Sequence, residues 1–424
     1  MSAKLAALAA KLTALTALLT SGCMAQTPAL KDAFKDCFRV GVALNQSQFG
    51  EENAAITKLI KTQFNSISPE NVLKWEAVHP EPAIYDFALA DAYVAFGQAN
   101  HMWIVGHNLV WHSQTPNWVF QDNQGKPLGR DALLARMRDH ISTVVGRYKG
   151  RINSWDVVNE ALEEDGKLRQ DSWMKIIGPD YIAKAFEFAH EADPDAELCY
   201  NDFSMENEPK RNGALALIKK LKDQGAPVTA VGLQGHIKMD WPTMAQLDAT
   251  IDSFAALGVK VNITELDVDV LPKAVAGNTA EVSLTAQARP ELNPYPNGLP
   301  PAVQKALAKR YADLFATYVK HRGTITRVTF WGVTNADSWL NDWPSWAEPV
   351  IRCCSIAKAS PPRHSMRSSK PHRISKCIHQ KGATFAYGRA GPNVPVKSGN
   401  FRPEPFRREF PFFGTNYGYN ICVK

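Results

Sequence analysis

Short apolar runs alternate along this chain with longer segments in which apolar residues recur at helical spacing. Several of the short runs are apolar at nearly every position, which is typical of strands buried on both faces. Eight runs predict strands: FRVGVAL from Phe38, FNSIS from Phe64, MWIVGHNLVW from Met102, INSWDVVN from Ile152, ELCYND from Glu197, VTAVGLQGH from Val228, VKVNITELDV from Val259 and TRVTFWGV from Thr326.

The segments between these runs predict helices. They are Glu51 to Lys61, Ala88 to Ala99, Arg130 to Tyr148, Pro179 to Ala192, Arg211 to Gln224, Met244 to Ala256 and Ala302 to His321. Eight strand-then-helix repeats within about 300 residues favour one (β/α)8 TIM barrel over a doubly wound sheet. The connection from Leu271 to Pro301 is rich in Pro, Asn, Ala and Gly and predicts an elaborated loop after a strand.

The active site of such a barrel lies at the C-terminal ends of its strands, where each apolar run turns polar. These positions carry carboxylates, amides, imidazoles and indoles, while Gly-rich phosphate loops and a Ser or Cys in a sharp turn are missing from the sequence. Glycoside hydrolysis needs two carboxylates, one to protonate the leaving oxygen and one to attack or steady the anomeric carbon. Indole faces suit the apolar faces of sugar rings.

Seven strand-end motifs resemble those of family 10 endo-β-1,4-xylanases. They are SPENVLKWE, GHNLVWHSQTPNW, WDVVNEAL, YNDF, VGLQGH, ITELDV and FWGVTNADSW. The resemblance runs from about Phe34 to Pro344, and WDVVNEAL with ITELDV in that order and spacing is highly specific. One departure is Asn335, where the family usually has Asp, a change that conserves size.

The resemblance implies that Glu160 is the general acid/base and Glu265 the nucleophile of a retaining reaction on xylan, with Asn159 holding the sugar's 2-hydroxyl. The residues implied around the cleaved bond are His107, Trp111, Gln234 and His236. Those implied for the next sugar on the glycone side are Glu70, Asn71 and Lys74, with Trp331 and Trp339 stacking above. No metal or other cofactor is implied.

Elementary chemistry supports the two catalytic assignments without the resemblance. An ionised carboxylate roughly 5 to 5.5 Å from Glu160 raises the pKa of Glu160, and that separation predicts retention of configuration. The pKa falls again once the partner becomes a neutral glycosyl ester, so one residue serves both steps. Asp267 shares a strand face with Glu265 and is expected to fix His236 in a tautomer that hydrogen-bonds the nucleophile.

Other polar residues carry weaker signals. Asp202 and Glu206 fit substrate contact and loop stabilisation equally well. His140, His190 and His321 are expected on helix surfaces with no role in the site.

Composition and charge limit the remaining possibilities. The 424 residues are 45% hydrophobic and 21% charged, as in a globular protein. The net charge of +6 comes from residues 345–424, which hold 14 Lys and Arg against three Asp and Glu. The preceding chain is mildly acidic and has no basic stripe with interleaved aromatics, so we expect no nucleic-acid partner. The seven cysteines show no metal-type spacing and predict neither a structural zinc site nor an essential disulfide.

The two ends of the chain differ from the barrel region, 26–344. Residues 1–25 combine Lys4 and Lys11 with an apolar run and small residues, which predicts a secretory signal peptide; lipid attachment at Cys23 is the weaker alternative because Thr20 stands where an aliphatic residue is usual. No other run approaches the ~20 apolar residues of a membrane span. We therefore expect an exported, soluble monomer.

Residues 345–424 resemble a frame-shifted translation, with a genuine basic appendage as the alternative. We expect this segment to be unpacked, the eighth helix to be missing and apolar surface to be exposed between the first and seventh helices. The function favoured is endo-β-1,4-xylanase. The alternatives are a cellulase-type β-glucanase and a xylan-binding protein inactivated by its altered C-terminus.

Overall fold

The computed structural model describes residues 28–272, 280–281, 290–295, 298–334 and 337–341. The predicted signal peptide, the basic segment 345–424 and Asn335 lie outside these residues, as does most of the predicted long connection. The boundaries proposed for the barrel region, the unpacked tail and the missing eighth helix therefore stay predictions.

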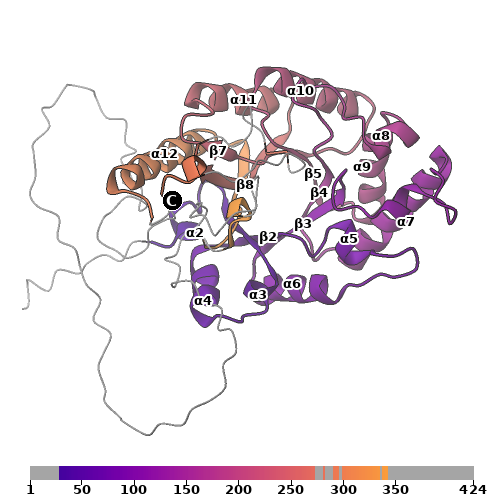
Figure 1. The fold of residues 1–424 in the computed structure, drawn as a ribbon, viewed down its shortest axis with the longest axis horizontal. Coiled ribbons are helices and arrows are strands. Elements are labelled where there is room, and N and C mark those ends of the chain that lie inside the picture. The colour runs from indigo at the N-terminus through magenta and orange to yellow at the C-terminus, as the bar shows by residue number, and fades with distance from the viewer. Residues whose placement is uncertain (1–27, 273–279, 282–289, 296–297, 335–336, 342–424) are drawn as a thin grey trace, which may run out of the picture. The chain divides into compact units, whose positions relative to one another are not determined.

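Eight parallel strands form a closed ring. They are β1 (Arg39–Leu44), β2 (Ser66–Pro69), β3 (Trp103–Val110), β4 (Ser154–Asn159), β5 (Glu197–Asp202), β6 (Ala230–Leu233), β8 (Lys260–Asp269) and β9 (Ile325–Phe330). Strands β1 to β6 pair in chain order, β6 pairs with β8, β8 with β9, and β9 with β1. The helices lie around the outside of this ring (Figure 1). The predicted (β/α)8 barrel is confirmed.

A ninth strand, β7 (His236–Lys238), follows β6 after a two-residue break and pairs with the far end of β8, where His236 lies opposite Asp267. Gly235 makes this break possible. Its φ is +80°, and a Cβ there would lie 2.9 Å from the side chain of Ile263. The sequence pattern predicted one continuous run here, because periodicity does not register a single left-handed residue.

In the described part of the chain, seven longer helices cover the strands: α4 (Ala54–Gln63), α6 (Ala88–Ala99), α7 (Arg130–Arg147), α9 (Tyr181–Ala192), α10 (Glu208–Asp223), α11 (Met244–Ala256) and α12 (Pro301–Lys320). All seven were predicted, and their ends differ from prediction by three residues or fewer. Side-chain caps explain some of the starts. The Asn53 side chain accepts hydrogen bonds at the start of α4, and Thr243 with Gln246 forms a capping box on α11.

Short helices were not predicted because one or two turns are too few to show an apolar period. They are α2 (Leu30–Ala33), α3 (Gln46–Phe49), α5 (Trp75–Val78), α8 (Ser172–Ile177) and the 3₁₀ helices η1 (Asn117–Phe120), η2 (Pro290–Leu292) and η4 (Trp339–Asn341). Among the described helices, none is long and apolar enough to cross a lipid bilayer.

The prediction that His140 and His321 lie on helix surfaces is wrong, whereas His190 is exposed. His140 belongs to the buried face of α7, where its ring stacks on that of Trp75 with centroids 3.6 Å apart. Its Nδ1 lies 3.2 Å from Nδ1 of His79. His321, at the end of α12, is buried against Asp248, with Nε2 2.7 Å from Oδ1. Aromatic stacking and a carboxylate partner make an inward imidazole favourable at these positions.

Few large hydrophobic side chains are exposed among the described residues. Ile84 and Leu89 are the exposed large hydrophobic side chains among them, and neither belongs to α4 or α12. The rings of Phe34, Phe38 and Phe315 pack together with centroids 5.1 to 6.1 Å apart and are buried. The expected exposure between the first and seventh helices depends on residues 342–424, which lie outside the described residues, so it stays a prediction.

Candidate active site

A cavity of about 520 Å³ opens at the C-terminal ends of the strands. The predicted residues that line it are Glu70, Asn71, Lys74, His107, Trp111, Asn159, Glu160, Gln234, His236, Glu265, Trp331 and Trp339. Asp267 does not line the cavity but contacts His236, which does. Ser113, Gln114 and Ala280 also line the cavity and were not predicted, because they lie within loops rather than at strand ends.

Glu160 follows the last residue of β4 and has a φ of +57°, a left-handed conformation that side chains other than glycine rarely adopt. Its carboxylate accepts hydrogen bonds from Trp111 Nε1 (2.7 Å), Gln234 Nε2 (2.9 Å) and Asn159 Nδ2 (3.0 Å). All three donors are neutral. Burial raises the pKa of Glu160 above its usual value, and neither these donors nor the nearby His112 reverse that shift.

Glu265 lies in β8 and has different neighbours. Its Oε1 accepts a hydrogen bond from Asn201 Nδ2 (2.8 Å), and its Oε2 lies 3.4 Å from Nε2 of His236. Burial favours the protonated form, but the His236 and His107 imidazoles outweigh it and hold the pKa of Glu265 below its usual value. Glu265 is therefore the ionised member of the pair.

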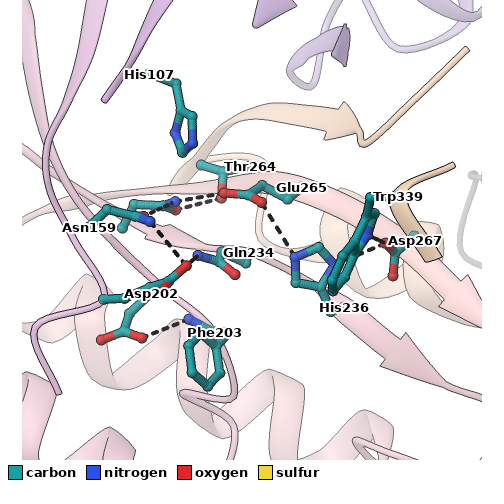
Figure 2. Close-up of polar contacts among 12 residues, drawn as sticks. His107, Asn159, Asp202, Phe203, Gln234, His236, Thr264, Glu265, Asp267 and Trp339 are labelled. Carbon is teal, nitrogen blue, oxygen red and sulfur yellow. Dashed lines mark hydrogen bonds and ion pairs between the residues drawn. The ribbon is translucent and has the colours of Figure 1, made fainter. Parts of the chain in front are cut away.

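Asn201, at the end of β5, joins the surroundings of the two carboxylates. Its Nδ2 donates to Glu265 and also to Asn159 Oδ1 (2.8 Å), while its Oδ1 accepts a hydrogen bond from Thr264 (2.6 Å). The chain of contacts continues from Glu265 to His236, and Figure 2 labels Asn159, Thr264, Glu265 and His236 along it. Because every amide in it has a partner, the two carboxylates are held in a rigid frame.

Comparison with known proteins decides the family. Residues 29–351 match the family model described as glycosyl hydrolase family 10. The chain belongs to this family. It is 46% identical over 328 residues to "Endo-1,4-beta-xylanase A" of Xylanibacter ruminicola, across 77% of this chain and 89% of that protein. It is 38% identical over 401 residues to "Exoglucanase XynX" of Acetivibrio thermocellus, across 88% of this chain and 34% of that longer protein.

Solved structures agree with the sequence comparisons. The structure of a family 10 endoxylanase retrieved from a sugarcane soil metagenome is 45% identical and superimposes with a TM-score of 0.75, across 78% of this chain and 95% of that one. This chain is therefore a glycoside hydrolase with a family 10 barrel, as the resemblance of its strand-end motifs implied.

In this family 10 chain, His236 lies between two carboxylates. Its Nδ1 is 2.9 Å from Asp267 Oδ2, and that oxygen also accepts a hydrogen bond from Trp339 Nε1 (2.8 Å; Figure 2). Burial disfavours the charged ring, but Asp267 and Glu265 together raise the pKa of His236 to about 10. The expected contact with Asp267 is present. The raised pKa favours the charged form of the ring at neutral pH, with Nε2 facing Glu265 as expected.

The glycone-side residues form a second polar group. Lys74 Nζ donates to Asn71 Oδ1 (2.9 Å) and to Gln114 Oε1 (2.5 Å), and it lies 4.9 Å from the centroid of the Trp111 ring. Burial lowers the pKa of Lys74 to about 8. Burial also raises the pKa of Glu70 to about 7, assisted by the charge of Asp337. Gln114 is the unpredicted member of this group, and its φ of +46° left no trace in the sequence pattern.

His107 is oriented by a residue from the neighbouring strand. Its Nδ1 lies 3.0 Å from Oδ2 of Asp156, which is buried inside β4 and was not predicted. Trp331 meets the His107 ring edge to face, with centroids 5.4 Å apart. The only feature of the sequence that could have indicated a role for Asp156 was its position in an apolar run, three residues before Asn159.

Asp202 has a structural role and does not line the cavity. It lies 2.9 Å from Lys210 Nζ, accepts a hydrogen bond from Tyr200 (2.6 Å) and accepts another from the Phe203 backbone N–H (2.9 Å). Of the two readings left open for Asp202, loop stabilisation therefore holds. Glu206 is buried and is also not among the lining residues. Over the described part of the chain, no group of three or more His, Cys, Asp or Glu side chains has a metal-binding arrangement.

Proposed function

We propose that this glycoside hydrolase is an endo-1,4-β-xylanase that cleaves internal bonds of xylan with retention of configuration. One observation carries the proposal. Two buried carboxylates share one cavity, and their pKa values are shifted in opposite directions, with Glu160 raised and Glu265 lowered. Such a pair supplies an acid and a nucleophile at the same pH.

In the first step Glu265 attacks the anomeric carbon while the bond from that carbon to the leaving oxygen breaks. Glu160 transfers its proton to that oxygen, so the shortened xylan chain leaves as an alcohol. The product is a glycosyl ester on Glu265 and an ionised Glu160. The three neutral donors around Glu160 then stabilise its new negative charge.

In the second step a water molecule attacks the anomeric carbon and gives its proton to Glu160. The ester bond breaks, and Glu265 leaves as a carboxylate beside the charged His236. Esterification removes the negative charge of Glu265, which lowers the pKa of Glu160 and makes it a base for this step. Two inversions at one carbon give net retention.

The remaining lining residues are proposed to bind sugar. Asn159 accepts from Asn201 through its Oδ1, so its amide group is oriented for a 2-hydroxyl beside the reacting carbon. Glu70, Asn71 and Lys74 are proposed to bind the next glycone sugar, with Trp331 and Trp339 stacking on its ring faces.

The direct test is release of reducing sugar by the purified full chain from xylan and from carboxymethylcellulose. We expect activity on xylan and a first product that keeps the β-configuration by NMR. A first product of inverted configuration would contradict the mechanism. A crystal structure with the two carboxyl groups more than about 7 Å apart would contradict it as well.

A cellulase-type β-glucanase is the second candidate, because a relative at 38% identity is named an exoglucanase. The same assay separates the two, since a glucanase releases more sugar from carboxymethylcellulose. A xylan-binding protein without turnover would release none from either polymer and would still be retained on xylan.

We also propose that residues 1–25 direct export and that the mature protein is a monomer. The charged start, apolar run and small residues of this segment support the first part. Mass spectrometry of the protein recovered outside the cytoplasm should show a new N-terminus after residue 25, and light scattering should give one chain per particle. A retained Met1, or a mass that indicates lipid on Cys23, would overturn the cleavage assignment.

A further inference from the structure

The chain folds back on itself directly after Glu160, in a short hairpin formed by residues 161–169. Leu162 and Leu168 pair as an antiparallel bridge, and Arg169 N donates to Ala161 O (2.8 Å). The hairpin thus returns the side chain of Arg169 to the backbone of Glu160, nine residues earlier.

Helix α10 holds the tip of this hairpin. Gly166 has a φ of +81°, and a Cβ on it would lie 2.3 Å from the carbonyl oxygen of Pro209. A Cβ on Gly213 would lie 2.1 Å from the carbonyl oxygen of Gly166. Backbone therefore packs directly on backbone, and the hairpin cannot shift without disturbing α10.

From this fixed position Arg169 makes two close contacts, besides longer ones to Leu162 O (3.5 Å) and Glu163 Oε2 (3.7 Å). Its Nε donates to the carbonyl oxygen of Glu160 (3.0 Å), and its Nη1 lies 2.8 Å from Oε2 of Glu281. The Arg169 and Glu281 side chains are 12% and 13% exposed, so water and salt weaken their attraction little. Arg169 is not among the residues that line the cavity.

The carbonyl held by Arg169 belongs to the residue whose backbone is under strain. A left-handed conformation at a residue other than glycine costs on the order of 1–3 kcal/mol and persists only where its surroundings enforce it. Here Glu160 N donates to Asn201 O (2.8 Å), and Arg169 holds the carbonyl on the other side. Both ends of the residue are therefore fixed.

We propose that Arg169 is the positioning residue of the general acid. It holds the Glu160 backbone in the left-handed conformation that aims the carboxyl group at the leaving oxygen, and Glu281 orients its guanidinium. This inference rests on the proposed function, because it concerns the proton-transfer step of glycoside cleavage.

The test uses the full chain and the dependence of rate on the leaving group. Dinitrophenyl xylobioside needs no proton from Glu160, whereas xylan does. For Arg169→Met we expect kcat/KM to fall about 10- to 100-fold on xylan and less than about threefold on the dinitrophenyl substrate, with KM little changed. Glu281→Gln should also lower kcat/KM on xylan more than on the dinitrophenyl substrate, but by a smaller factor than Arg169→Met. Arg169→Lys should give a loss between those of the other two variants.

Arg130→Met is the matched control. Arg130 also donates to a backbone carbonyl, that of Ile177, and pairs with a carboxylate, that of Asp180, but it lies on α7 away from the site. We expect wild-type rates from it on both substrates.

Several outcomes would overturn the inference. Equal losses on both substrates would mean that Arg169 acts on binding or folding, and no loss on xylan would mean that Glu160 does not need it. If circular dichroism shows that Arg169→Met is unfolded, Arg169→Lys and Glu281→Gln decide by the same comparison. A wild-type protein inactive on both substrates would instead contradict the proposed function.

Discussion

Glu160 and Glu265 are the same residue type, buried in one cavity, yet the chemistry around them differs. Glu160 receives hydrogen bonds from three neutral side chains, and its burial is not compensated by a cation in contact. Glu265 accepts one hydrogen bond from the amide of Asn201 and lies beside the imidazole of His236, whose charged form Asp267 stabilises. The comparison shows that burial alone does not set the state of a carboxylate, because the charge of the nearest donor decides the direction of its pKa shift.

The strongest test of this difference is Glu265→Gln. An amide keeps the shape of the side chain but cannot attack carbon, so we expect kcat on xylan to fall by at least about 10⁴-fold. Binding of xylo-oligosaccharides, measured by isothermal titration calorimetry, should persist. Glu187→Gln on the exposed face of α9 serves as the control. Activity of Glu265→Gln within tenfold of wild type would show that Glu265 is not the nucleophile.

The next largest effect is expected from Glu160→Ala. Loss of the general acid should lower kcat/KM on xylan by about 10²- to 10⁴-fold. The value of kcat/KM on dinitrophenyl xylobioside should change little, because this substrate has a good leaving group. Steady-state kinetics on both substrates provide the measurement. Equal losses on the two substrates would remove the acid assignment from Glu160.

A third change weakens the charge beside Glu265. In Asp267→Asn the pKa of His236 falls from about 10, since one of the carboxylates that raise it is gone. The lower pKa brings the loss of the His236 charge into the neutral to basic range, so the basic limb of the kcat/KM profile should move to lower pH by about one unit. The acidic limb should stay in place, because the ring is charged there in both proteins. A basic limb that does not move would show that the charge on His236 does not support Glu265.

The smallest effect is expected on the Glu160 side. The hydrogen bond from Gln234 stabilises the ionised form of Glu160, so its removal in Gln234→Met should raise the pKa of Glu160 further. The basic limb of the kcat/KM profile should then move to higher pH by about one unit or less, whatever happens to KM. A basic limb that moves to lower pH would show that this contact does not favour the carboxylate.

The barrel and most of the cavity lining could be predicted because both rest on repeated local patterns. Buried parallel strands are apolar at nearly every position, and a barrel exposes polar groups where such an apolar run turns polar. Glu160, Gln234 and Glu265 were found in this way.

Asp267 was predicted from its strand face, but the other supporting residues could not be predicted, because their roles depend on contacts between distant segments. Asp156 lies inside an apolar strand, and its partner His107 is 49 residues away. His140 occupies the apolar face of α7, but only the neighbouring rings of Trp75 and His79 explain why a buried imidazole is tolerated there. Arg169 lies in a polar hairpin of ordinary composition, and its contact with Glu160 needs the turn geometry at Gly166.

The contact between Gly166 and Gly213 has a consequence for engineering. It fastens the tip of the hairpin at Gly166, and the bridge between Leu162 and Leu168 fastens the base, while the neighbouring Glu164 and Asp165 are exposed. This tip is an insertion point at the rim of the barrel mouth. We expect a short loop or an affinity tag grafted between Glu164 and Asp165 to interrupt the turn hydrogen bond from Gly166 N to Glu163 O, and to leave the base of the hairpin and the frame around Glu160 in place.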